Sequence, residues 1–250
     1  MPVAEIVPVA LILLLSSMVQ GMVGFASGMI AVPSLLIVGR PLHEAVTISA
    51  VAAFAQNLLG VYSLRREIAF REAVRPILTR FAALPIGVLA LKFSGNLDQH
   101  HVRQLVGLVV LFGLAMIARS PDASRWRWRR LWDNGAFLSS GFLVGFCGIG
   151  GPPLVMWAVA QGWPPARTRG FLFLVFFSSM FLQLLLLGMA YGRSITAPML
   201  IGVAGAPIVL LGTYLGLQIG RRFSRRRLRA VSFVILAVMA IREIVGPLID

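Results

Sequence analysis

The feature that most constrains this chain is a succession of apolar segments, most of them long enough to cross a lipid bilayer. A helix needs about 20 apolar residues to span roughly 30 Å of hydrocarbon. Hydrophobic residues make up 58% of the 250 residues and charged residues only 13%, too little polar surface for a soluble domain of this size. We therefore expect an all-α polytopic membrane protein, because a transmembrane barrel would show alternating segments of about ten residues. The apolar segments are 6–25, 29–38, 45–64, 73–91, 102–118, 136–160, 171–191, 197–219 and 230–249.

The start of the chain and its charge fit a membrane protein. Glu5, and no basic residue, precedes the first apolar segment, and no small-residue cleavage site follows it. We interpret this segment as a retained helix and not as a signal peptide. The formal charge of +14 would suggest nucleic acid on a soluble chain. Here the basic residues lie in short stretches between apolar segments, so we interpret them as charges at a membrane face and expect no nucleic-acid partner.

Two details of composition argue against metal or enzyme chemistry. Cys147 is the only cysteine, and the three histidines lie at loop edges without ligand partners at useful spacing. We expect no metal and no cofactor. The chain has no HExxH, GxSxG or paired-carboxylate motif, so we expect no enzyme activity, although an intramembrane enzyme or assembly factor stays the least favoured alternative. The GxxxxGK[ST] loop of ATP-driven pumps is also missing.

An internal repeat divides the chain. When the sequence is shifted by 120 residues, GMVGFASGMIAVPSLL (21–36) aligns with GFLVGFCGIGGPPLVM (141–156). This alignment pairs Gly21 with Gly141, Gly28 with Gly148, and Pro33 with Pro153. A short loop with a proline and then three apolar segments follow each stretch. We predict two membrane repeats, 1–120 and 121–250, within one integral membrane domain.

The basic residues decide how each repeat crosses the membrane. If each glycine-broken pair of segments crosses once, the charges divide almost equally between the two faces. If each pair is instead a hairpin that returns to its own side, 17 of the 23 basic residues collect on one face and four on the other. This second arrangement agrees with the positive-inside rule. It makes the two repeats inverted, with both termini in the periplasm and the basic loops in the cytoplasm.

The broken hairpins suggest a binding site. The segment after each break is short; 29–38 would extend about 15 Å, half the bilayer. Its first backbone N–H groups lack helical partners, and such groups are tolerated only inside protein or beside a wet cavity. A helix N-terminus of this kind attracts an anion, and glycine lets the anion approach closely. Pro152 and Pro153 suit the first turn of a helix.

Other interpretations of these residues stay open. Glycine also permits close helix packing, and we favour that role for Gly21, Gly141 and Gly145. Polar residues within apolar segments often mark a pathway, but they also bond helices together. Arg167 and Arg169 suit membrane anchoring better than substrate contact. No acidic residue lies mid-segment, so if transport is coupled to protons, the substrate itself would carry the proton.

The two broken motifs resemble a known family. GMVGFASGMIAVPSLL followed by GRPLHEAV, and GFCGIGGPPLVMW in the second half, are similar to the paired motifs of the TauE/SafE family of sulfite exporters, also called the toluene sulfonate uptake permease family. The resemblance covers essentially the whole chain. The family usually has a glycine-rich run where this chain has Ala26-Ser27-Gly28. The resemblance implies a bacterial inner-membrane carrier that imports or exports sulfite, sulfonates or other small organosulfur anions.

The sequence thus predicts a secondary transporter for a small, sulfur-containing anion, which works by alternating access. An anion channel with the same pore is the main alternative. Oligomeric state is open. The candidate substrate-binding residues are Phe25, Ser27, Gly28, Pro33, Gln56, Asn57, Cys147, Gly148, Gly150, Gly151, Pro152, Pro153, Ser178, Ser179 and Gln183. For Cys147 we favour a packing role over a chemical one.

Overall fold

A computed structural model describes residues 3–68, 70–95, 97–118 and 130–222, together with residues 234, 237, 238, 241 and 242. Within these ranges the chain forms α-helices joined by short turns and two 3-10 turns, with no strand. The prediction of an all-helical fold is therefore confirmed. The apolar segment 230–249 lies almost wholly outside the described residues.

Several described helices are long and apolar enough to cross a membrane. By length and composition, four helical stretches qualify: Ile6–Val23, Leu42–Glu67, Phe70–Ser94 and Pro165–Ala204. Two shorter apolar helices, α2 (Ser27–Ile37) and α7 (Gly151–Ala160), are too short to cross. The remaining helices are α1 (Val3–Val23), α3 (Leu42–Leu64), α4 (Phe70–Ser94), α5 (Gln99–Ala118), α6 (Arg130–Cys147), α8 (Pro165–Tyr191), α9 (Thr196–Ala204) and α10 (Ala206–Arg222).

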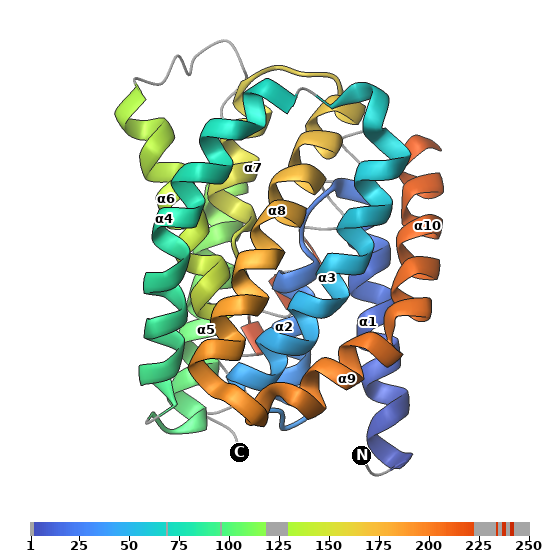
Figure 1. The fold of residues 1–250 in the computed structure, drawn as a ribbon. Helices are drawn as coiled ribbons and strands as arrows, with labels where there is room; N and C mark the ends of the chain where they lie inside the picture. Colours follow the sequence, from blue (N-terminus) through green and yellow to red (C-terminus); the bar gives the residue numbers. More distant parts are fainter. Residues whose placement is uncertain are drawn as a thin grey trace.

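The two short helices each fold back beside the helix before them. In Figure 1, α1 rises from the lower end of the molecule and α2 descends to that same end. Helix α6 descends from the upper end, and α7 returns upward. Helices α3, α4 and α8 run between the two ends, and α10 rises from its junction with α9 to the upper end. The two breaks therefore lie in the interior and are approached from opposite ends.

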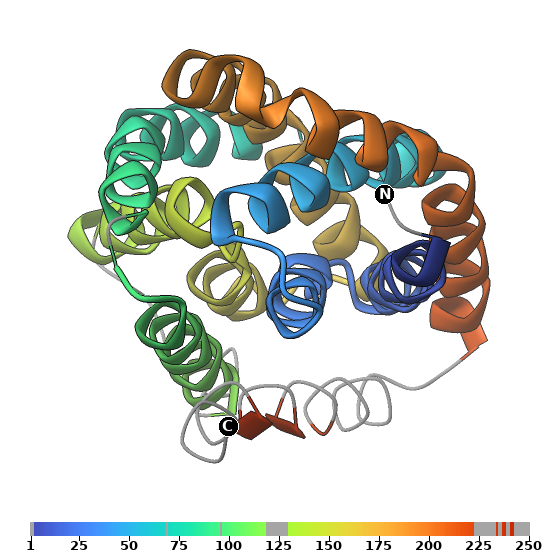
Figure 2. The ribbon, with the colours of Figure 1, turned by 90° about the horizontal axis from the view of Figure 1, so that it is seen from below.

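The short helices lie between longer ones. Helix α2 contacts α3 on one side and α5 on another, and α7 contacts α8 and α5. Figure 2 shows the bundle from below; in Figure 1, α2 occupies the lower half of the molecule and α7 the upper half. Their residues are among the most deeply buried, including Val32, Leu35 and Leu154. Helices that are apolar on every side suit such an interior position.

Glycines bring the first helix of each hairpin close to a helix of the other half. A Cβ added to Gly21 of α1 would lie 2.5 Å from the Thr213 carbonyl oxygen of α10. A Cβ on Gly145 of α6 would lie 2.4 Å from the Leu84 carbonyl oxygen of α4. Only glycine permits backbones to approach this closely. Close packing, the role favoured for these glycines from the sequence, is confirmed.

Two boundaries differ from the prediction. The segment 197–219 is two helices, α9 and α10, because Pro207 lacks the N–H that would continue the helical ladder across Gly205. The two breaks also correspond at a spacing of 124 residues and not 120. Gly24 and Gly148 are the first residues of the breaks, and both have positive φ, +87° and +69°. The alignment by 120 residues was wrong here by about one helical turn.

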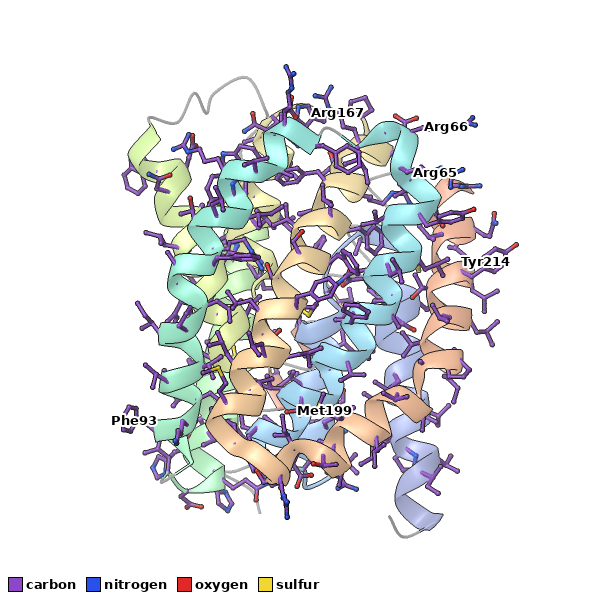
Figure 3. All side chains as sticks on the ribbon, viewed as in Figure 1. Arg65, Arg66, Phe93, Arg167, Met199 and Tyr214 are labelled. Atoms are coloured by element: carbon purple, nitrogen blue, oxygen red, sulfur yellow. The ribbon has the colours of Figure 1, made fainter. Side chains whose placement is uncertain are left out.

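The ends of the bundle differ in charge. The end of α3, the starts of α4 and α8 and the end of α10 share the upper end of the view, where Arg65, Arg66 and Arg167 are labelled (Figure 3). The opposite end holds the α2–α3 turn with Arg40 and the end of α8 beside Arg193. Within the described residues, arginine is therefore concentrated at the upper end.

Candidate functional site

Each hairpin breaks over three residues. Helix α1 ends at Val23, and residues 24–26 connect it to α2; α6 ends at Cys147, and residues 148–150 connect it to α7. Gly24 N donates to the Gln20 carbonyl oxygen at 2.7 Å, and Gly148 N to that of Val144 at 3.0 Å. A positive-φ glycine that closes the last helical turn in this way is a common helix end. The chain can then reverse direction inside the protein.

Ala26 stands in the first break at a position that suits glycine. Its φ is +89°, the only positive φ of a non-glycine residue among those described. An L-residue in the left-handed region costs about 1–2 kcal/mol because its Cβ crowds the backbone. This is the place where the sequence departs from the glycine-rich run typical of the family it resembles. The first break therefore keeps a glycine-like conformation without glycine.

The two breaks touch each other. A Cβ added to Gly28, in the first turn of α2, would lie 2.1 Å from the Gly148 carbonyl oxygen. Pro152 and Pro153 occupy the first turn of α7, as predicted, where their missing N–H groups cost little. The N-terminal turns of α2 and α7 thus approach one common point. Both present the positive ends of their helix dipoles there.

A small polar cavity lies at this junction, with a volume of about 40 Å³. Because a water needs roughly 10–15 Å³ on this measure, the cavity has room for about three waters or a compact oxoanion. Its lining comes from α1, α3, α6 and α8 as well as from both breaks. The lining residues are Gln20, Ala26, Ser27, Gly28, Met29, Ala53, Gln56, Asn57, Val144, Gly148, Ile149, Gly150, Gly151, Phe176 and Met180.

Gln20 braces the first break. Its Oε1 accepts a hydrogen bond from the Ser27 backbone N–H at 3.0 Å, and its Nε2 donates to Asn57 Oδ1 at 2.9 Å. One α1 side chain therefore connects the start of α2 to α3. Ser27 N is one of the helix-start donors that need an outside partner, and Gln20 satisfies it.

Two amides beside the cavity keep unused hydrogen-bonding capacity. Both polar atoms of Gln56, whose side chain is fully buried, have no partner in the described structure, and neither has Asn57 Nδ2. Buried amides without partners are rare and costly, which points to water or a ligand in the space they face. The two residues offer N–H donors that suit the oxygens of an anion.

Arg80 braces the second break. This α4 side chain is fully buried, and its Nε donates to Ser179 Oγ at 3.1 Å. Its Nη1 donates to Ser140 Oγ, and the Ser140 hydroxyl in turn donates to the Gly150 carbonyl oxygen. The guanidinium carbon lies 5.3 Å from the ring centroid of Phe176, which lines the cavity. A short chain of contacts therefore links this cation to the second break.

The charge of Arg80 is uncompensated within the described residues. No carboxylate pairs with it there, and its Nη2 has no hydrogen-bond partner. Serine hydroxyls and an aromatic face are weak substitutes for a counter-ion in an apolar interior. A cation held this way beside a polar cavity attracts a negative ligand.

The cavity includes seven of the residues predicted from sequence. Ser27, Gly28, Gln56, Asn57, Gly148, Gly150 and Gly151 line it. Others lie close without lining it: Ser179 accepts from Arg80, and Gln183 Nε2 donates to the Val144 carbonyl oxygen at 2.8 Å. Ser178 bonds the Leu174 carbonyl oxygen within its own helix. The remaining predicted residues, Phe25, Pro33, Cys147, Pro152 and Pro153, pack around the breaks outside the lining.

Three residues were missed from the sequence: Gln20, Arg80 and Ser140. Each is polar and lies inside an apolar segment, which is a signal in itself.

Arg167 and Arg169, for which the sequence favoured the same anchoring role, lie in different surroundings in the structure. Arg167 pairs with Glu72 at 2.7 Å at the surface, whereas the side chain of Arg169 turns inward and donates to the Met22 carbonyl oxygen at 3.4 Å.

Fold and site together define a polytopic helical membrane protein with a small cavity between two broken hairpins and a buried arginine close to it. The chain belongs to the sulfite exporter TauE/SafE family, whose model matches residues 9–243. It is 26% identical over 221 residues to the "Probable sulfite/organosulfonate exporter TauE" of Cupriavidus necator (strain H16), a match that covers 87% of this chain and 85% of that protein. No solved structure matches the chain. The family resemblance predicted from the motifs is confirmed, and with it the class of transporter.

Proposed function

We propose that the chain is a secondary transporter that binds a small sulfur oxoanion, such as sulfite or a sulfonate, in the cavity between the two breaks. The observation that carries this proposal is Arg80, a buried cation without a carboxylate partner, linked through Ser140 to the Gly150 carbonyl group at the cavity. A negative ligand supplies the missing counter-charge. The name of the Cupriavidus relative supports the sulfur chemistry of the cargo.

The cavity donors suit an oxoanion. The starts of α2 and α7 offer favourable helix dipoles and the backbone N–H groups of Gly28 and Gly151, although Ser27 N–H is already bonded to Gln20 and the two prolines of α7 have no N–H. Gln56 and Asn57 offer side-chain amides. At about 40 Å³ the cavity accommodates sulfite better than a bulky sulfonate. A larger cargo would need more room between the two breaks than this cavity provides.

Transport by alternating access follows from an inverted two-repeat arrangement, 1–120 and 121–250. It is supported by hairpins that enter from opposite ends and by the matched positive-φ glycines at the breaks. In this scheme one repeat rocks against the other around the cavity. The arginine-rich end faces the cytoplasm of a bacterial inner membrane, and both termini lie in the periplasm.

Flux into proteoliposomes tests the proposal. We expect saturable uptake and counterflow of labelled sulfite or a small sulfonate by the native chain. Arg80→Met should lower this flux at least tenfold, and Arg80→Lys should restore part of it. Arg71→Met is the matched control, because Arg71 lies exposed on the same helix, outside the cavity. Conductance without counterflow would indicate a channel, and equal flux in the native chain and Arg80→Met would contradict the proposed site.

A further inference from the structure

A second charged cavity lies away from the central one, at the arginine-rich end. It is a cleft of about 520 Å³ between the end of α3, the start of α8 and the end of α10. Four arginines line it, Arg65, Arg66, Arg169 and Arg221, against a single carboxylate, Glu67. Figure 3 shows Arg65 and Arg66 at the upper end of α3, on the side of α10. We call this cavity the arginine cleft.

The charges of the arginine cleft are not neutralised within it. Among the described residues no ion pair joins Glu67 to any of the four guanidinium groups. The guanidinium of Arg65 lies over the ring of Tyr62, 4.5 Å from its centroid, so it is held at the wall by an aromatic face. Four cations gathered around one space repel each other unless an anion occupies it.

Arg169 forms the inner wall of the cleft. Its residue is 8% exposed, and its Nε is buried without a hydrogen-bond partner. Its Nη1 donates to the Met22 carbonyl oxygen, and its side chain lies against Gly24, where an added Cβ would be 3.0 Å from its Cγ. A guanidinium buried this deeply normally uses its donors fully. The guanidinium at the inner wall of the cleft therefore keeps unused hydrogen-bonding capacity.

We propose that the arginine cleft is a second oxyanion site, which binds a tetrahedral or pyramidal group such as phosphate, sulfonate or sulfite. Guanidinium groups match such groups because their N–H donors pair with two oxygens at once. Two sources share this chemistry: a free anion at the basic end of the protein, and the phosphate of an anionic lipid headgroup. Binding in the cleft does not depend on transport; only a role in supplying cargo would rest on the function proposed above.

The contacts of Arg169 place this site beside the first break. Met22 and Gly24 belong to the last turn of α1 and to the break, and Ala26, two residues further, lines the central cavity. An anion bound in the cleft would therefore lie against the same side chain that contacts the end of α1. Arg169 thus connects the cleft to the break that borders the central cavity.

Counting bound anions tests the proposal. Equilibrium dialysis of labelled sulfite against the full chain, in neutral detergent and stripped of lipid, should find two sites in the native protein. The double variant Arg66→Gln, Arg221→Gln should weaken one of them by roughly tenfold or more. Both side chains are exposed, so the fold should be unaffected. Arg71→Gln with Arg193→Gln is the control, since it removes the same charge outside the cleft.

The outcomes separate the two sites. Loss of one site in the cleft variant and of the other in Arg80→Met supports both proposals. A single site that is lost in Arg80→Met and unchanged in the cleft variant overturns the second site and leaves the transport site standing. A site lost only in the cleft variant supports the cleft and contradicts the central site. Displacement of the cleft anion by phosphatidylglycerol, and not by phosphatidylcholine, would assign the cleft to a lipid headgroup; without displacement it belongs to a free anion.

Discussion

Gly28→Ala tests the contact between the two breaks most directly. The added Cβ would lie 2.1 Å from the Gly148 carbonyl oxygen, whereas ordinary contact begins at 3.4 Å. The two breaks would have to separate by about 1.3 Å, because the clashing atom is backbone and cannot rotate away. Overpacking of this kind costs about 2 kcal/mol. In a protein of this size that lowers the melting temperature by roughly 4–8 °C.

Melting in detergent and sulfite flux in proteoliposomes measure the two consequences. Flux should fall at least tenfold, because the displaced breaks no longer enclose the cavity. The control is Gly188→Ala in α8, where an added Cβ meets nothing within 4 Å. That variant should melt no lower than the native chain, since alanine is the better helix former. Native melting and native flux in Gly28→Ala would refute the contact between the breaks.

Three further predictions test the surroundings of the cavity. Gly150→Leu should abolish flux while the protein still inserts, because its Cβ would lie 2.1 Å from Val144 Cγ2; unchanged flux argues against a site at the break. Gln20→Leu should destabilise the protein by about 1–3 kcal/mol, since Ser27 N–H loses its partner; equal melting of this variant and the exposed control Gln161→Leu would show that the brace is unimportant. Tags at both termini should react with an impermeant label from the periplasm, because two repeats of three crossings each return the chain to its starting side. A tag found in the cytoplasm would contradict this topology.

Much of the fold was predictable because its signals are local. Runs of apolar residues indicated the helices, and glycines or prolines within these runs indicated both breaks. Gly148 and Gly150 of the second break, and Gly151 at the start of α7, line the cavity. Ser178 and Ser179 show where this reasoning ends. Adjacent residues on a helix point about 100° apart, so the sequence places both at one depth while only Ser179 meets Arg80.

The register of the repeat shows a second limit. Three glycine or proline identities favoured a shift of 120 residues, but the positive-φ residues Gly24 and Gly148 correspond at 124. At that spacing Gly21 also matches Gly145, and each packs against the opposite half. The sequence contains this second alignment too, as GMVGF against GFCGI. A glycine that permits close helix packing and a glycine that permits a positive φ look alike in a sequence. Only the backbone geometry distinguishes the two roles.

Arg80 was overlooked because the count of basic residues at the two membrane faces included only residues between apolar segments, and Arg80 lies within one. Its position already carried a signal: it lies ten residues into α4, about 15 Å from the helix end and too far to reach water along the helix. Such a cation must find its partners inside the protein. Here the partners are two serines and an aromatic ring, all neutral. An anionic cargo would complete this set, whereas a neutral compound of the same shape would leave the charge unpaired. In the proposed transporter, the buried arginine would thus provide a physical basis for selecting anions that cavity shape alone does not.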